Sequence, residues 1–119
     1  MIKVTLSENM KQKPRADKLV FGRVFTDHMF KMNYNPQEGW HNAQIIPYSH
    51  FELEPSALVF HYGQAIFEGL KAYKGKDGKI TMFRPRDNFV RMNRSAESLC
   101  IPQIDIDFVM KALTQLVEL

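Results

Sequence analysis

Four arginines lie close together in the second half of the chain and could bind an anion. Arg84, Arg86, Arg91 and Arg94 fall within eleven residues of sequence. Guanidinium groups donate paired hydrogen bonds to phosphate oxygens and stay charged at any working pH, so the cluster is compatible with a phosphorylated cofactor or substrate. The simpler alternative is a helix face that carries solvated or salt-bridged arginines, and the residues alone favour it.

The lysines and histidines carry a weaker signal. Lys71 is the best internal candidate for Schiff-base chemistry, which a desolvated amine can perform, but a strand lysine with a solvated ammonium is the favoured interpretation. Glu68 and Asp27 could act as acid–base groups, although the sequence pairs neither. A histidine beside Asp27 or Tyr62 is expected to complete a buried hydrogen-bond network. No two histidines are spaced i, i+4 and no cysteine or paired carboxylate joins them, so we expect no metal site. The histidines are His28, His41, His50 and His61.

These side chains must be positioned by a mixed set of strands and helices. β-branched and aromatic residues predict a strand over 19–33, a turn over 35–39 and a second strand over 39–46, with 48–53 either a strand or irregular. The dipeptide Asp77-Gly78 predicts a hairpin with a tight primed turn. The expected fold is α+β, with an open sheet built from Leu19–Ile46 and Tyr73–Phe83.

Three helices are expected to cover this sheet, near Pro55–Leu70, Asp87–Leu99 and Asp107–Leu119. Asp87 is predicted to cap the second helix, and Asp105 or Asp107 the third. Cys100 is expected to be a small buried hydrophobe. Most aromatic side chains should form the core, and one or two near Gly22 and Gly63 could line a pocket. The aromatic set comprises Phe21, Phe25, Phe30, Tyr62, Phe67, Tyr73, Phe83 and Phe89.

Length and composition limit the classes of function. The chain has 119 residues, 45% of them hydrophobic, and a formal net charge of +3. This charge is too small and scattered for a nucleic-acid surface. No membrane span or signal peptide is expected, and a cytoplasmic location follows as the default. Residues 1–18 are expected to form an extended arm, with a short edge strand at Ile2–Leu6, and residues 19–119 a small α+β domain. The chain stops inside a helical pattern, so a longer protein is expected.

Three segments together resemble one enzyme family. They are FGRVFTDHM at 21–29, HYGQAIFEGLKAY at 61–73 and MFRPRDNFVRMNRSA at 82–96. Their order and spacing resemble the branched-chain amino-acid aminotransferases, which are pyridoxal-phosphate enzymes of fold type IV. The resemblance runs from about Thr5 to the final helix and covers the small N-terminal domain only. D-amino-acid aminotransferases and aminodeoxychorismate lyases share the F-E-G core and stay as alternatives, as does a non-catalytic stand-alone dimerisation or binding domain.

The resemblance assigns roles to four residues of this chain. Arg91 matches the arginine that binds the phosphate of pyridoxal 5'-phosphate. Phe21 and Phe67 match aromatic walls of the substrate side-chain pocket, and Tyr62 matches a tyrosine supplied to the neighbouring subunit of a homodimer. Lys71 is not the Schiff-base lysine, which lies beyond the equivalent of Leu119. No catalytic residue is therefore expected in this chain, which alone should be inactive.

The resemblance also implies the reaction of the complete protein. It would transfer an amino group between leucine, isoleucine or valine and 2-oxoglutarate, with pyridoxal 5'-phosphate as cofactor and branched-chain amino acids and 2-oxo acids as its small-molecule partners. The absent lysine would hold the cofactor.

Overall fold

A computed structural model describes residues 1–119, apart from the side chain of Ala16. The chain forms two compact units, one of residues 1–50 with 118–119 and one of residues 51–117. The first contains β1 (Lys3–Val4), the 3-10 turn η1 (Ala16–Lys18), β2 (His28–Asn35) and β3 (Gly39–Pro47). The second contains α1 (Leu58–His61), β4 (Ala72–Lys74), β5 (Ile80–Met82), α2 (Pro85–Ser98) and most of α3 (Ile106–Glu118). The predicted α+β class is confirmed, but the strands form two sheets instead of one.

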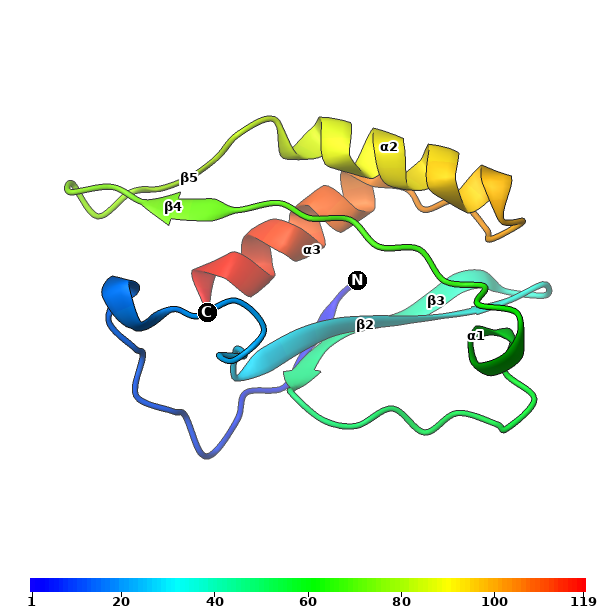
Figure 1. The fold of residues 1–119 in the computed structure, drawn as a ribbon, viewed down its shortest axis with the longest axis horizontal. Helices are drawn as coiled ribbons and strands as arrows, with labels where there is room; N and C mark the ends of the chain where they lie inside the picture. Colours follow the sequence, from blue (N-terminus) through cyan, green and yellow to red (C-terminus); the bar gives the residue numbers. More distant parts are fainter. The chain divides into compact units, whose positions relative to one another are not determined.

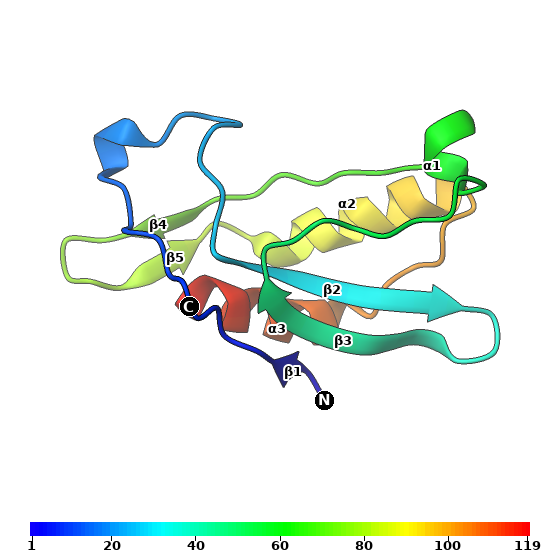
Figure 2. The ribbon, with the colours of Figure 1, turned by 90° about the horizontal axis from the view of Figure 1, so that it is seen from below.

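A three-stranded sheet in the order β1-β3-β2 organises the first unit (Figure 2). β2 and β3 pair antiparallel through the predicted turn, where the Asn35 side-chain oxygen accepts the backbone N–H of Gln37 and of Glu38. The predicted edge strand is confirmed as β1, which pairs parallel to β3. Ile45 on β3 is fully buried, at 0% exposure, and is the centre of this small core. The central strand is thus fixed by pairing on both edges.

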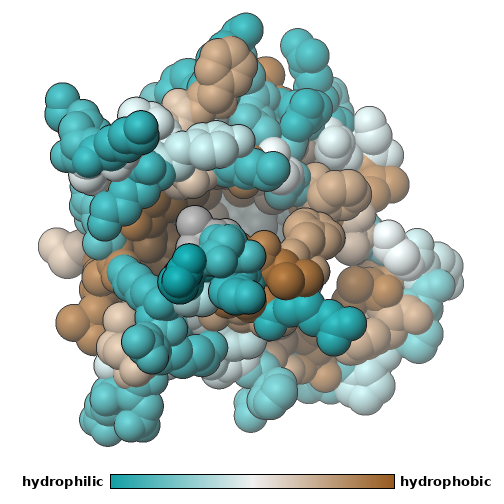
Figure 3. All heavy atoms as spheres, turned by 60° about the vertical axis from the view of Figure 1, so that its left-hand side comes forward, coloured by the Kyte–Doolittle hydropathy of each residue, from teal (hydrophilic) through white to brown (hydrophobic). Residues whose placement is uncertain are grey.

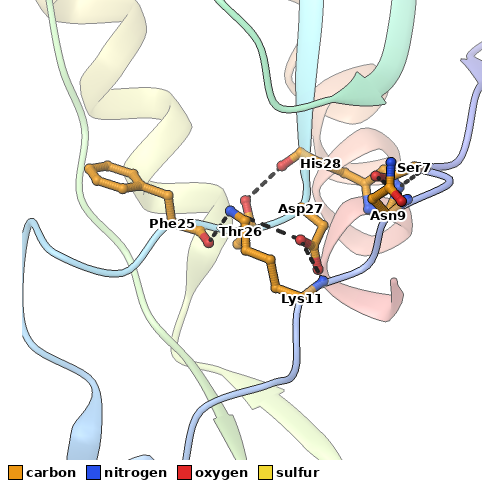
Figure 4. A network of polar contacts seen from close by, with 7 residues as sticks. All are labelled: Ser7, Asn9, Lys11, Phe25, Thr26, Asp27 and His28. Atoms are coloured by element: carbon orange, nitrogen blue, oxygen red, sulfur yellow. Dashed lines mark hydrogen bonds and ion pairs between the residues drawn. The ribbon is translucent and has the colours of Figure 1, made fainter.

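Polar contacts bind the N-terminal segment to the start of β2 (Figure 4). The backbone N–H of Ser7 donates to Nε2 of buried His28 at 2.9 Å, so the ring must be an acceptor at this nitrogen. The backbone N–H of Lys11 donates to Oδ1 of Asp27 at 3.2 Å. The prediction that a histidine beside Asp27 completes a hydrogen-bond network is confirmed. The arm boundary at residue 18 stays a prediction.

The first predicted strand was placed too early, because residues 19–27 are not in a strand. Gly22 has a φ of 71° in a turn closed by the Arg23 N–H, which donates to the Val20 carbonyl. A positive φ of this kind interrupts an extended chain and favours glycine. Residues 48–53 are irregular, which was one of the two predicted outcomes.

The helix predicted over Pro55–Leu70 is wrong beyond a single turn. α1 covers only Leu58–His61, and residues 63–71 belong to no helix or strand. Gly63, with a φ of 58°, follows the turn and redirects the backbone. The residues after it alternate between half-buried and exposed positions, which is the period of an extended chain.

The predicted hairpin is confirmed, but its turn is not of the primed type. β4 and β5 pair antiparallel, with Lys74 opposite Ile80. Gly78 alone among the central turn residues has a positive φ, of 80°, and the Gly75 N–H donates to the Lys79 carbonyl at 2.7 Å. This is a three-residue loop with glycine in the left-handed position, a common alternative to the two-residue primed turn.

The two long helices lie close to their predicted ranges. α2 begins at Pro85, because Arg84 adopts a left-handed conformation with φ 46° and proline is favoured in the first helical turn. The prediction that Asp87 caps α2 is therefore wrong, and Asp87 forms an ion pair with Arg84 inside the first turn. The Asp105 side chain accepts the Phe108 N–H at 3.1 Å, which confirms Asp105 as the cap of α3.

Small residues dominate the buried positions of the helical unit. The prediction that most aromatic side chains form the core is largely wrong. Ala96, Val109 and Ala112 are buried, whereas most of the predicted aromatic core is exposed. Hydrophobic and hydrophilic residues are intermixed on the face that Figure 3 shows. Cys100 is also exposed, because it takes a φ of 54° just after the end of α2 instead of packing on the helix. The exposed members are Phe21, Phe25, Tyr62, Phe67, Tyr73 and Phe83.

Candidate functional site

The extended segment 63–71 runs along α2, and this arrangement creates the site (Figure 1). The Gln64 amide donates to the Leu99 carbonyl at 2.8 Å near the end of α2, and the Asn88 amide donates to the Gly69 carbonyl at 2.9 Å near its start. The two contacts hold the segment antiparallel to the helix. Since side chains alternate along an extended chain, Glu68 faces the helix and Phe67 faces away.

Glu68 binds Arg91 of α2 through a two-pronged ion pair. Nε of Arg91 donates to Oε2 of Glu68 at 2.9 Å, and Nη2 donates to Oε1. The Asn88 amide donates to the same Oε1 at 3.1 Å, and the Gly69 N–H donates to it at 3.0 Å. The Glu68 side chain is only 9% exposed, whereas that of Arg91 is 67% exposed. The carboxylate is thus enclosed and the guanidinium is open on its other side.

This environment keeps both groups charged. The hydrogen bond from Arg91 is the largest influence and lowers the pKa of Glu68 to about 2, against an opposing effect of desolvation. The Gly69 N–H and the Asn88 amide add smaller lowering effects. Glu68 in turn raises the pKa of Arg91. The pair is ionised at any physiological pH.

Arg91 keeps donors for a further anion. A guanidinium carries five N–H bonds in a planar fork, and Glu68 occupies two of them. Three remain, on a side chain that is mostly exposed. Their number and planar geometry suit the oxygens of a phosphate group. The residues present therefore fit a phosphorylated cofactor.

The four arginines do not form one joint anion site. Arg86 donates from Nη1 to Oδ1 of Asp107 at 2.6 Å, which raises the pKa of Arg86, and Arg84 pairs with Asp87. Both pairs are exposed. The salt-bridge alternative is thus confirmed for these two arginines, and among the four only Arg91 is anchored by an enclosed carboxylate.

The structure places the predicted pocket residues on the surface. Phe67 is 91% exposed and Tyr62, at the C-terminal end of α1, is 83% exposed. Phe21 is fully exposed in the turn of the first unit. Neither Phe67 nor Tyr62 belongs to the core of its unit, so both are available to line a binding site. The exposed Lys71 is at the end of the extended segment.

Other classes of site find no support in the described part of the chain. No three His, Cys, Asp or Glu side chains among the described residues are grouped so that they could hold a metal ion. His61 contacts the Pro55 carbonyl through Nε2 at 2.7 Å, and His41 contacts the Gly39 carbonyl through Nδ1 at 2.9 Å. None of the described helices is long and apolar enough to cross a membrane.

The sequence did not predict that Glu68 and Asn88 contact each other in the site. Residues 64, 66, 68 and 70 are half-buried and residues 65, 67, 69 and 71 are exposed. The residue types do not repeat this alternation, since Ala65, Ile66 and Phe67 are apolar in succession. The sequence therefore carries no period-two signal for an extended segment here.

The known proteins to which this chain is similar are branched-chain amino-acid aminotransferases. The chain is 51% identical over 116 residues to branched-chain-amino-acid aminotransferase 2 of Bacillus subtilis (strain 168), which covers 98% of this chain and 32% of that protein. It is 53% identical over 109 residues to branched-chain-amino-acid transaminase 1 of the same organism, covering 92% of this chain and 31% of that protein. A third relative, from Mycolicibacterium smegmatis, is 52% identical over 97 residues, or 82% of this chain and 26% of that protein. No family model matches the chain.

These similarities confirm the resemblance proposed from the three motifs. The relatives are fold-type IV aminotransferases, and the chain matches their N-terminal part. Within that class, the proteins that the chain matches are branched-chain amino-acid aminotransferases, and the similarity runs over nearly the whole chain. The chain spans about a third of the length of the curated relatives it matches.

The ion pair between Glu68 and Arg91 leads to a prediction about the titration of Glu68. Because the pKa of Glu68 is lowered on folding, its contribution to stability is present above the ordinary pKa of 4.5 and is lost as the pH falls toward about 2. In an NMR titration of labelled glutamate carboxyl carbons, Glu68 should titrate near pH 2. Arg91→Gln should raise that midpoint, and Arg94→Gln, whose side chain is outside the contact, should leave it unchanged. A Glu68 midpoint near 4.5 in the unmodified protein would contradict the ion pair.

Proposed function

We propose that this chain is the N-terminal part of a branched-chain amino-acid aminotransferase. The complete protein transfers an amino group between leucine, isoleucine or valine and 2-oxoglutarate, with pyridoxal 5'-phosphate as cofactor. The observation that carries this proposal is the 44–53% identity to branched-chain aminotransferases over nearly the whole chain. The full-length protein should convert L-leucine and 2-oxoglutarate to glutamate much faster than it uses D-alanine. A preference for D-alanine would favour the D-amino-acid enzymes instead.

In this proposal Arg91 holds the cofactor phosphate. When bound, pyridoxal phosphate supplies an electron sink for chemistry at the substrate α-carbon. Arg91 contributes its three remaining N–H donors and a permanent positive charge, which complements close to two negative charges on the phosphate. The open side of the guanidinium supports this role. The chain's part in catalysis is therefore to bind and orient.

The aromatic residues Phe21, Phe67 and Tyr62 are proposed to surround the substrate side chain. A leucine side chain has no hydrogen-bonding group, so only shape and desolvation can recognise it. Rigid aromatic walls provide both at small entropic cost. The exposure of all three rings supports the proposal, because none of them is used for packing within its own unit.

The chain alone is proposed to be inactive. In the family, the lysine that holds the cofactor lies outside the segment that this chain matches. Incubation of the 119-residue chain with the cofactor, L-leucine and 2-oxoglutarate should yield no glutamate above a protein-free control. Steady turnover by the chain would refute this part of the proposal.

The complete protein is further proposed to act as a cytoplasmic homodimer. Its metabolic relatives support the location, and the many exposed apolar side chains support burial against other protein. Light scattering of the full-length protein should give twice the monomer mass, and a monomer at all concentrations would count against a dimer. Fractionation of the source cells should recover it with other cytoplasmic enzymes.

The role of Arg91 can be measured by cofactor retention. A charge-assisted hydrogen bond contributes about 1.5–3 kcal/mol, so Arg91→Gln in the full-length protein should weaken cofactor binding by about one to two powers of ten. Arg86→Gln is the matched control, because Arg86 lies on the same helix but pairs with Asp107. It should have much less effect. Equal losses in both variants would mean that the arginines act only as a general positive field.

Phe67 can be tested by substrate preference. Because Phe67 is exposed in this chain, Phe67→Ala should cost less than the roughly 3–5 kcal/mol of a buried phenylalanine. It should lower kcat/KM for leucine and isoleucine more than for alanine, since a methylene in such a pocket is worth about 1–3 kcal/mol. Phe83→Ala, a similarly exposed ring on the same unit, is the control. A large drop in Tm with an unchanged leucine-to-alanine ratio would place Phe67 in a core instead.

A further inference from the structure

Glu68 accepts more hydrogen bonds than any other ion-paired carboxylate among the described residues. It accepts from Nε and Nη2 of Arg91, from the Asn88 amide and from the Gly69 N–H. By contrast, Asp107 accepts a hydrogen bond from Nη1 of Arg86 and its side chain is 73% exposed. Such a set of donors fixes a carboxylate in one orientation. A surface carboxylate that interacts only with solvent needs neither this burial nor this set of donors.

We propose that Glu68 is a positioning residue, which holds the Arg91 guanidinium so that its unused N–H groups are presented to the phosphate of the cofactor. The inference rests on the proposed function, in which Arg91 binds that phosphate. Asn88 and the Gly69 N–H act one step further out, because they hold Glu68 itself. Glu68 touches neither cofactor nor substrate in this arrangement.

The physical reason is pre-organisation. A free arginine side chain has many rotamers, and binding must order them at a cost to affinity. The two-pronged contact with Glu68 orders the guanidinium before the phosphate arrives. Because the guanidinium is planar, fixing one edge also fixes the direction of the remaining N–H bonds. A carboxylate that binds a ligand-holding side chain acts in the same way at metal sites.

One opposing effect must be weighed. The Glu68 carboxylate is negative and repels a phosphate, so its removal could strengthen binding. In the proposed arrangement the guanidinium would lie between the two anions, so the repulsion would act over a longer distance than the attraction. Neutralising Glu68 would remove this weaker repulsion, but it would also free the guanidinium to move away from the phosphate. We therefore expect a net loss of phosphate affinity when Glu68 is neutralised.

The experiment compares two probes on the full-length protein freed of its cofactor. Pyridoxal 5'-phosphate and pyridoxal differ only in the phosphate, so the ratio of their Kd values isolates phosphate binding from the general state of the protein. Glu68→Gln should weaken pyridoxal 5'-phosphate binding on the order of tenfold and leave pyridoxal binding unchanged. Asn88→Ala, which leaves the ion pair in place, should cause a smaller loss with the same selectivity. Asp107→Asn, which breaks the exposed pair between Arg86 of α2 and Asp107 of α3, should change neither Kd.

A double variant separates this inference from the proposed function. If Glu68 acts through Arg91, Glu68→Gln should cause no further loss in an Arg91→Gln background. Full phosphate affinity in Arg91→Gln alone would overturn the role of Arg91 and the inference with it. Loss in Arg91→Gln with unchanged or tighter binding in Glu68→Gln would leave Arg91 as the anchor and overturn the inference only. Equal weakening of both probes in Glu68→Gln and in Asn88→Ala would show that Glu68 only tethers the segment 63–71.

Discussion

The contact between Glu68 and α2 is the interaction on which the second unit depends. It joins a segment without helix or strand hydrogen bonds to a regular helix, through one ion pair and an amide bridge from Asn88. Without such partners the backbone polar groups of an extended segment would have to be satisfied by water alone. The same contact fixes which side chains face the helix. It therefore determines that Phe67 faces outward and that Arg91 is held on one edge.

The alternation of side chains along the segment 63–71 decides which of them contact the helix and which are exposed. An extended chain presents successive side chains to opposite faces, so a carboxylate and an aromatic ring that are adjacent in sequence serve different purposes. The Glu68 side chain binds Arg91 of the helix, whereas the Phe67 side chain is exposed. In a helix, adjacent side chains point about 100° apart instead of to opposite faces, so this separation of roles depends on the extended backbone. The irregular backbone of 63–71 is thus part of the site and not a gap between elements.

The exposed apolar side chains impose a second constraint. Phe67, Tyr62 and Phe83 lie on the surface of a unit whose buried core consists of small residues. Isolated exposed apolar residues are ordinary, but many large ones on a small unit indicate surfaces that contact other protein or a ligand. This agrees with the similarity of the chain to curated proteins that are about three times as long.

Regular elements with local signals were predictable from the sequence, and those set by tertiary contacts were not. The turn at 35–39, the strand over 39–46 and the cap at Asp105 follow from residue types that act within a few positions. The extended segment 63–71 did not follow, because its conformation depends on α2, which begins only at Pro85. The start of α2 was missed for a related reason, since the left-handed Arg84 is decided by the chain on both sides.

In the candidate site, too, some features are predictable from the sequence and others depend on tertiary contacts. The family resemblance and the structure were therefore both needed to single out Arg91. The family motif singled out Arg91, but no property of its sequence neighbourhood distinguishes it from Arg86 on the same helix. The structure distinguishes them by their carboxylates, since the partner of Arg91 is enclosed and held by two further donors, whereas the partner of Arg86 is open to solvent. An exposed pair contributes little and is easily exchanged, but an enclosed one keeps its geometry. A guanidinium with lasting geometry suits the oxygens of a tetrahedral phosphate group, so the burial of Glu68 is the physical feature that distinguishes Arg91 from Arg86 and supports the role proposed for it.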